Sequence, residues 1–67
     1  MLNGLVIKRG TEYCARKSTK VRMDPDGSCW SEDIQKARVF LNHDQACRTA
    51  RRVGGTVRLM TNGKVEE

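Results

Sequence analysis

Apolar residues in the stretch 42–55 recur with the period of an α-helix, and this is the longest such pattern in the chain. A rotation of about 100° per residue places Ala46, Ala50 and Val53 on one face of that helix. We therefore predict one main helix over residues 43–53, with its alanine face packed on the remaining structure. The arginines of this stretch then lie away from the packed face.

Both ends of the predicted helix carry terminating signals. Asn42 is a favourable N-cap, and Gln45 stands three residues later in the position of a capping box. Asp44 precedes Arg48 by four residues, which is the favourable order for an ion pair along a helix. The pair Gly54-Gly55 supplies a left-handed C-terminal stop.

Shorter runs of alternating apolar residues predict β-strands on both sides of this helix. Residues 4–9 and 12–16 are expected to form a hairpin, because Gly10 opens a two-residue turn of the mirror-image type that hairpins prefer. Residues 56–60 form the last long strand, and a turn follows at 61–64.

The region between the hairpin and the helix contains shorter elements. Residues 21–23 and 28–30 can form two short strands, because the proline, aspartate and glycine between them favour a tight turn. Ser31 is expected to cap a single helical turn that ends at Lys36.

Together these elements predict an α+β fold in one domain spanning residues 1–67. A small antiparallel sheet of three to five short strands is packed on one face by the single main helix. A chain of 67 residues buries only about 60% of its unfolded surface, so we expect a marginal stability. The longest aliphatic run has three residues, so no membrane partner is expected.

Charge is distributed unevenly around a net value of +5. Residues 8–22 carry six cations and one acid, residues 24–44 carry five acids and two cations, and residues 48–58 carry four arginines and no acid. Two basic blocks around an acidic middle suit docking onto a charged protein or nucleic acid. A solvated surface that keeps a small protein soluble has the same composition, and this alternative stays open.

Three cysteines at wide spacing argue against a disulfide framework and favour a reducing cytoplasm. Cys14, Cys29 and Cys47 form, with His43, four ligands of the type that zinc uses, so a structural zinc site is the alternative that we keep. No close cysteine pair supports it. His43 and Cys47 can share one helical edge, but no third orienting group accompanies them. We therefore predict no enzyme, no catalytic residue and no cofactor.

A family resemblance rests on four short motifs. They are Leu5-Val6-Ile7-Lys8-x-Gly-x-x-Tyr13, Trp30 before an acidic turn, Lys36-Ala37-x-Val39-Phe40, and Gly54-Gly55 before a closing strand. The whole resembles small proteins of phages and prophages, built as a hairpin, a short helical turn, one main helix and a last strand. Such proteins often bind a host machine, and the anti-CRISPR inhibitors are one class of them.

The resemblance and the charge pattern lead to one functional expectation. We expect a non-enzymatic binding protein of phage type that docks on, and inhibits, a host protein or nucleoprotein complex in the host cytoplasm. The alternative is a basic accessory protein that binds nucleic acid directly by contacting phosphates. The oligomeric state is left open. In both cases the expected contact residues are Arg48, Arg51 and Arg52 on the helix, with Lys8, Arg9, Arg16 and Lys17 on the first hairpin.

Overall fold

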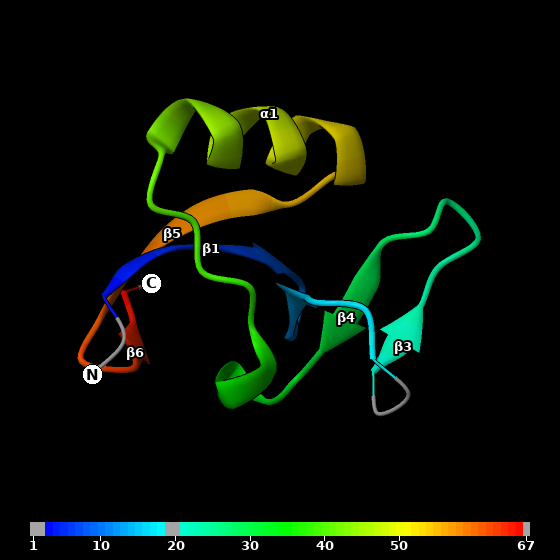
Figure 1. Ribbon diagram of the computed structural model, residues 1–67, viewed down its shortest axis with the longest axis horizontal. Coiled ribbons are helices and arrows are strands. Elements are labelled where there is room, and N and C mark those ends of the chain that lie inside the picture. Colours follow the sequence, from blue (N-terminus) through cyan, green and yellow to red (C-terminus); the bar gives the residue numbers. More distant parts are fainter. Residues whose placement is uncertain (1–2, 19–20, 67) are drawn as a thin grey trace.

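A computed structural model of the chain describes residues 3–18 and 21–66, which form six strands, one α-helix and one short 3₁₀-helix (Figure 1). In chain order the elements are β1 (Gly4–Arg9), β2 (Glu12–Ala15), β3 (Arg22–Met23), β4 (Cys29–Ser31), η1 (Ile34–Lys36), α1 (His43–Val53), β5 (Thr56–Thr61) and β6 (Lys64–Val65). The sheet is antiparallel throughout, with the order β3-β4-β2-β1-β5-β6. The α+β prediction is confirmed. The strand count exceeds the predicted three to five because both two-residue strands, β3 and β6, pair with a neighbour.

The helix α1 begins and ends where its sequence signals predict. The Asn42 side chain accepts a hydrogen bond from the backbone N–H of Gln45 at 3.1 Å, which satisfies one of the free donors of the first turn. Gly54 adopts a left-handed conformation with φ of 75°, and its N–H bonds to the carbonyl of Ala50. The predicted ion pair between Asp44 and Arg48 was wrong, because these two described residues do not approach to within 4.0 Å.

The core lies between α1 and the sheet, where α1 crosses above β1 and β5 (Figure 1). Seven buried side chains form it, and the partly buried Leu5 and Val57 pack against them. The seven are Ile7, Cys14, Trp30, Phe40, Ala46, Ala50 and Val53. The predicted alanine face of the helix is therefore confirmed. Alanines permit a close approach of helix and sheet because they add little volume beyond the backbone.

Residues 37–40 fill the opening where β1 and β2 diverge beyond their shared turn. Phe40 exchanges two backbone hydrogen bonds with Leu5, at 2.7 and 2.9 Å. On the other side, the backbone N–H of Arg38 donates to the carbonyl of Cys14 at 2.8 Å. The segment thus satisfies backbone groups of both strands, and these bonds hold Arg38 beside the core.

The helical turn that precedes this segment is shorter than predicted and has a different cap. The side chain of Asp33, not that of Ser31, caps η1 by accepting from the backbone N–H of Gln35 at 2.9 Å. The Ser31 hydroxyl instead accepts from the N–H of Asp33 at 3.1 Å. The prediction of Ser31 as the cap was therefore wrong by two residues, because both side chains offer the same local bond.

Gly55 is required where the chain leaves α1 and enters β5. A Cβ atom at this position would lie 2.5 Å from Cγ2 of Ile7 and 3.2 Å from the carbonyl oxygen of Lys8, whereas one at Gly54 would meet nothing within 4 Å. We expect Gly55→Asn to lower the free energy of unfolding by about 1–3 kcal/mol, the usual cost of overpacking. Gly54→Asn is the matched control, since asparagine tolerates the left-handed conformation. Urea unfolding measures both variants, and equal losses would contradict this role of Gly55.

Candidate functional site

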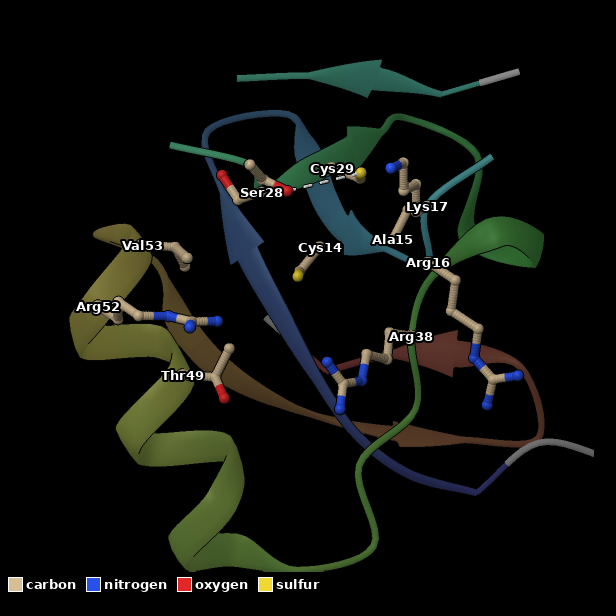
Figure 2. A pocket seen from close by; sticks show the side chains of 11 residues that line it. Cys14, Ala15, Arg16, Lys17, Ser28, Cys29, Arg38, Thr49, Arg52 and Val53 are labelled. Atoms are coloured by element: carbon tan, nitrogen blue, oxygen red, sulfur yellow. Dashed lines mark hydrogen bonds between the residues drawn. The ribbon is translucent and has the colours of Figure 1, made fainter. Parts of the chain in front are cut away.

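A hollow of about 450 Å³ opens between α1, β2, β4 and the segment 37–40 (Figure 2). Four of its lining residues are cationic, and no acidic residue of the described chain lines it. The four are Arg16, Lys17, Arg38 and Arg52. We call this hollow the basic groove. A groove lined by charges of one sign concentrates the field that they produce and attracts anions.

Three different parts of the chain bring these cations together. Arg16 and Lys17 directly follow β2, and Arg52 belongs to the last turn of α1. Arg38 is fixed through its backbone bond to β2, and its guanidinium lies 4.6 Å from the ring centroid of Phe40. Figure 2 shows the side chains of Arg38 and Arg52 pointing toward each other across the hollow, with Arg16 extending to one side. Arg38 and Arg52 are therefore the central cations of the groove.

The basic groove continues along the helix. A neighbouring hollow of about 420 Å³ shares Arg38, Thr49 and Arg52 with it and adds Arg48. A further hollow joins Arg48 to Arg51, but Asp44 also lines that one. The cationic surface thus runs from the end of β2 to the middle of α1.

Two acidic residues, Glu12 and Asp24, are paired with Arg9 and Arg22. Arg22 donates to Glu12 through Nη2 at 2.6 Å and Nε at 3.1 Å, and it also pairs with Asp24. Arg9 donates to the second oxygen of Asp24 at 2.5 Å. The hydrogen bonds from Arg22 hold the pKa of Glu12 below its ordinary value, and those from Arg9 and then Arg22 do the same for Asp24. These carboxylates are therefore charged at neutral pH and neutralise Arg9 and Arg22.

No such partner reaches the groove. Within residues 3–18 and 21–66, none of Arg16, Lys17, Arg38, Arg48 and Arg52 forms an ion pair. Their charges stay available to a ligand.

Asp26 lies at the edge of the basic groove. It lines a smaller hollow together with Arg52, but its carboxylate accepts from the backbone N–H of Ser28 at 3.0 Å and from the Ser28 hydroxyl at 2.6 Å. These two bonds lower the pKa of Asp26, so its negative charge persists at the edge of the groove.

The first hairpin contributes less than the sequence predicted. The Arg9 side chain donates to the carbonyl of Val53 at 3.0 Å and stacks 3.9 Å above the Trp30 ring centroid. It therefore serves the fold. Lys8 lies on the opposite face of β1 from Ile7, with its Nζ atom 5.9 Å from the ring centroid of Tyr13. Of the predicted hairpin residues, only Arg16 and Lys17 line the same hollow as Arg52.

The four residues of the zinc alternative are not brought together. Cys14 and Cys29 lie at the groove, whereas the sulfur of Cys47 contacts the ring nitrogens of His43 at 3.6 and 3.7 Å on the helix. In the described part of the chain no three histidine, cysteine, aspartate or glutamate residues lie close enough to hold a metal ion. Burial raises the pKa of the Cys14 thiol, against the smaller opposing effect of Arg38, so this thiol is not activated as a nucleophile.

The hydroxyl groups of the groove are also engaged. The Ser28 hydroxyl donates to Asp26 and accepts from the indole N–H of Trp30 at 2.9 Å. The Thr49 hydroxyl donates to the carbonyl of Gln45 at 2.9 Å. The side-chain donors that a ligand meets are therefore the guanidinium and ammonium groups, an arrangement suited to binding an anion.

Arg38 is the main site residue that sequence reasoning missed. It stands in the predominantly acidic middle of the chain, and its neighbours form no periodic pattern long enough to predict a strand. The short extended motif Ala37-x-Val39-Phe40 was the available signal, since alternation there places Arg38 and Phe40 on the same side.

Comparisons of the chain with protein-family models, with curated proteins and with solved structures found no match. Among the described residues, no helix has the length and apolar character needed to cross a membrane.

Acid should destabilise the fold through Glu12 and Asp24. Their folded-state pKa values are depressed, so their charged forms stabilise the protein above the unfolded values of about 4, and that contribution is lost as the pH falls through the folded values. We expect the melting temperature to decrease as the pH falls from about 5 to about 2.

The variant Arg22→Gln tests this cause, because it removes the hydrogen bonds that depress the pKa of Glu12. Its melting temperature should depend less on acid than that of the wild type. Arg58→Gln, which removes an exposed arginine of β5 that has no carboxylate partner in the described chain, should keep the wild-type dependence. A wild-type acid dependence in Arg22→Gln would count against the assigned pairing.

Proposed function

We propose that this protein is a non-enzymatic binding protein that docks on a host protein or nucleoprotein complex and inhibits it, in the manner of the small phage proteins that its sequence resembles. The contact surface consists of the basic groove and the exposed arginines of α1. Its place of action is the cytoplasm of the host cell, and it needs no cofactor.

One observation carries this proposal. Glu12 and Asp24 form ion pairs with Arg9 and Arg22, whereas within the described residues the cations of the basic groove and its extension along the helix are unpaired. Paired charges at a surface contribute little to binding, whereas unpaired cations of one patch steer an acidic partner toward it. Arginine predominates in this patch and suits bidentate contact with carboxylate or phosphate groups.

The engaged hydroxyl groups and the buried thiol of Cys14 support a binding role over a catalytic one. Nucleophilic catalysis needs a nucleophile within reach of a base. The His43 and Cys47 pair meets that distance, but no third residue of the described chain hydrogen-bonds to the His43 ring. We therefore assign this pair no catalytic role.

Charge reversal tests the contact surface. The double variant Arg48→Glu/Arg52→Glu should lose partner capture from a bacterial lysate by at least about tenfold, because it turns attraction into repulsion at the centre of the patch. Arg48 and Arg52 are exposed, as are the control positions Arg58 and Lys64. The melting curves of both double variants should therefore stay close to that of the wild type.

The control Arg58→Glu/Lys64→Glu changes the net charge equally on β5 and β6, and it should capture the partner normally. Equal losses in both double variants would contradict a localised surface. Treatment of the lysate with nuclease distinguishes the classes of partner. A captured protein that resists nuclease supports docking on a host protein or complex, and recovery of nucleic acid with no enriched protein contradicts it.

A further inference from the structure

We propose that the basic groove is a binding site for the sugar–phosphate backbone of a nucleic acid strand, with Arg38 and Arg52 as the central phosphate ligands. The proposal rests on the proposed function in its nucleoprotein form and names the component of the complex that enters the groove. Contact is to phosphates and is independent of base sequence.

The donor set of the groove fits phosphate. Arg38 and Arg52 point toward each other across the hollow, so an oxyanion between them can receive N–H donors from both sides (Figure 2). Neither guanidinium has a carboxylate partner in the described chain, so binding a phosphate breaks no internal ion pair. Arg38 is also held by its backbone bond to Cys14 and its stacking on Phe40, which reduces the entropy lost on binding.

The extent of the cationic surface favours a polyanion over a single phosphate group. The two adjoining hollows share Arg38, Thr49 and Arg52, and together they carry five cations without an acidic lining residue among those described. The five are Arg16, Lys17, Arg38, Arg48 and Arg52. A single phosphorylated side chain would occupy only one of the two hollows, whereas a nucleic acid strand presents successive phosphates to the cations of both.

The positions of the aromatic residues explain why this contact does not depend on the bases. Trp30 and Phe40 are buried, with 0% and 2% of their surface exposed, and Tyr13 is only partly exposed beneath Lys8. Binding of unstacked bases depends on exposed rings, and none of the three aromatic side chains faces the groove. Backbone phosphate therefore remains as the group that the surface recognises.

Salt dependence tests the proposal with the purified protein alone. Fluorescence anisotropy with a short labelled DNA duplex and a short labelled RNA should show binding that weakens steeply with salt. A slope of log affinity against log salt of roughly −4 to −5 is expected on duplex DNA, because each neutralised phosphate contributes about −0.9 and the surface carries five cations. The double variant Arg38→Gln/Arg52→Gln should reduce the magnitude of this slope by about 2.

Two further variants make the test specific. Arg58→Gln/Lys64→Gln removes the same charge outside the groove and should leave the slope unchanged. Asp26→Asn should tighten binding, because it removes the negative charge beside Arg52 while asparagine can keep the turn bond to the backbone of Ser28.

Several outcomes would overturn the proposal. They are absence of binding to both nucleic acids at about 50 mM salt, an equal loss of slope in both glutamine double variants, and tighter binding to a phosphopeptide than to either nucleic acid. These results leave the proposed function standing if charge reversal on the helix still abolishes capture of a nuclease-resistant partner. Conversely, if no nuclease-resistant partner is captured but the salt slopes are as predicted, the groove remains a phosphate-binding site and the proposed docking function is wrong.

Discussion

The pairing of Arg9 and Arg22 with the carboxylates of Asp24 and Glu12 is the interaction on which the surface of this protein depends. Arg9 connects β1 to the end of α1 through Val53 and to the region of β3 through Asp24, and it lies over the buried Trp30. One guanidinium therefore joins three parts of the chain. Together, Arg9 and Arg22 neutralise the negative charges of Asp24 and Glu12 at the surface, because two cations pair with two carboxylates.

The rest of the charge distribution follows from that arrangement. With Glu12 and Asp24 neutralised, unpaired cations remain at the end of β2, on the segment 37–40 and on α1, where they line adjoining hollows, and within the described chain Arg58 of β5 is unpaired outside them. The packing of 37–40 between β1 and β2 supplies backbone partners for both strands and places Arg38 opposite Arg52. The segment 37–40 thus both satisfies backbone groups of the sheet and forms one side of the basic groove.

Local signals predicted the helix well and the groove poorly. Asn42 and Gly54 act through bonds within a few residues, and the alanine spacing follows the helical period, so the sequence alone predicted where α1 begins and ends and which face packs. The strands of the first hairpin and the turn before β4 were predicted for the same reason. Arg9 was expected on a contact surface, but its bond to Val53 joins residues 44 positions apart, and no local pattern contains that information.

The role of Arg38 could not be predicted from local patterns either. Its sequence neighbourhood is acidic, and its value to the site comes from Arg52 and Lys17, which lie on other elements. The arginines of α1 were predicted as a group because they share one helix. The structure divides them, since Arg52 and Arg48 line the groove and its extension, whereas Arg51 lines only the further hollow that it shares with Arg48 and Asp44.

Nuclear magnetic resonance of the arginine Nε–Hε groups can distinguish the two arginines that are paired within the fold, Arg9 and Arg22, from the groove arginines that stay free for a ligand. A short DNA duplex would be added to the protein labelled with nitrogen-15. We expect shifted signals for Arg38, Arg48 and Arg52, with those of Arg9, Arg22 and Arg58 unchanged. Equal shifts across all these arginines, or the largest shift at Arg58, would contradict this expectation.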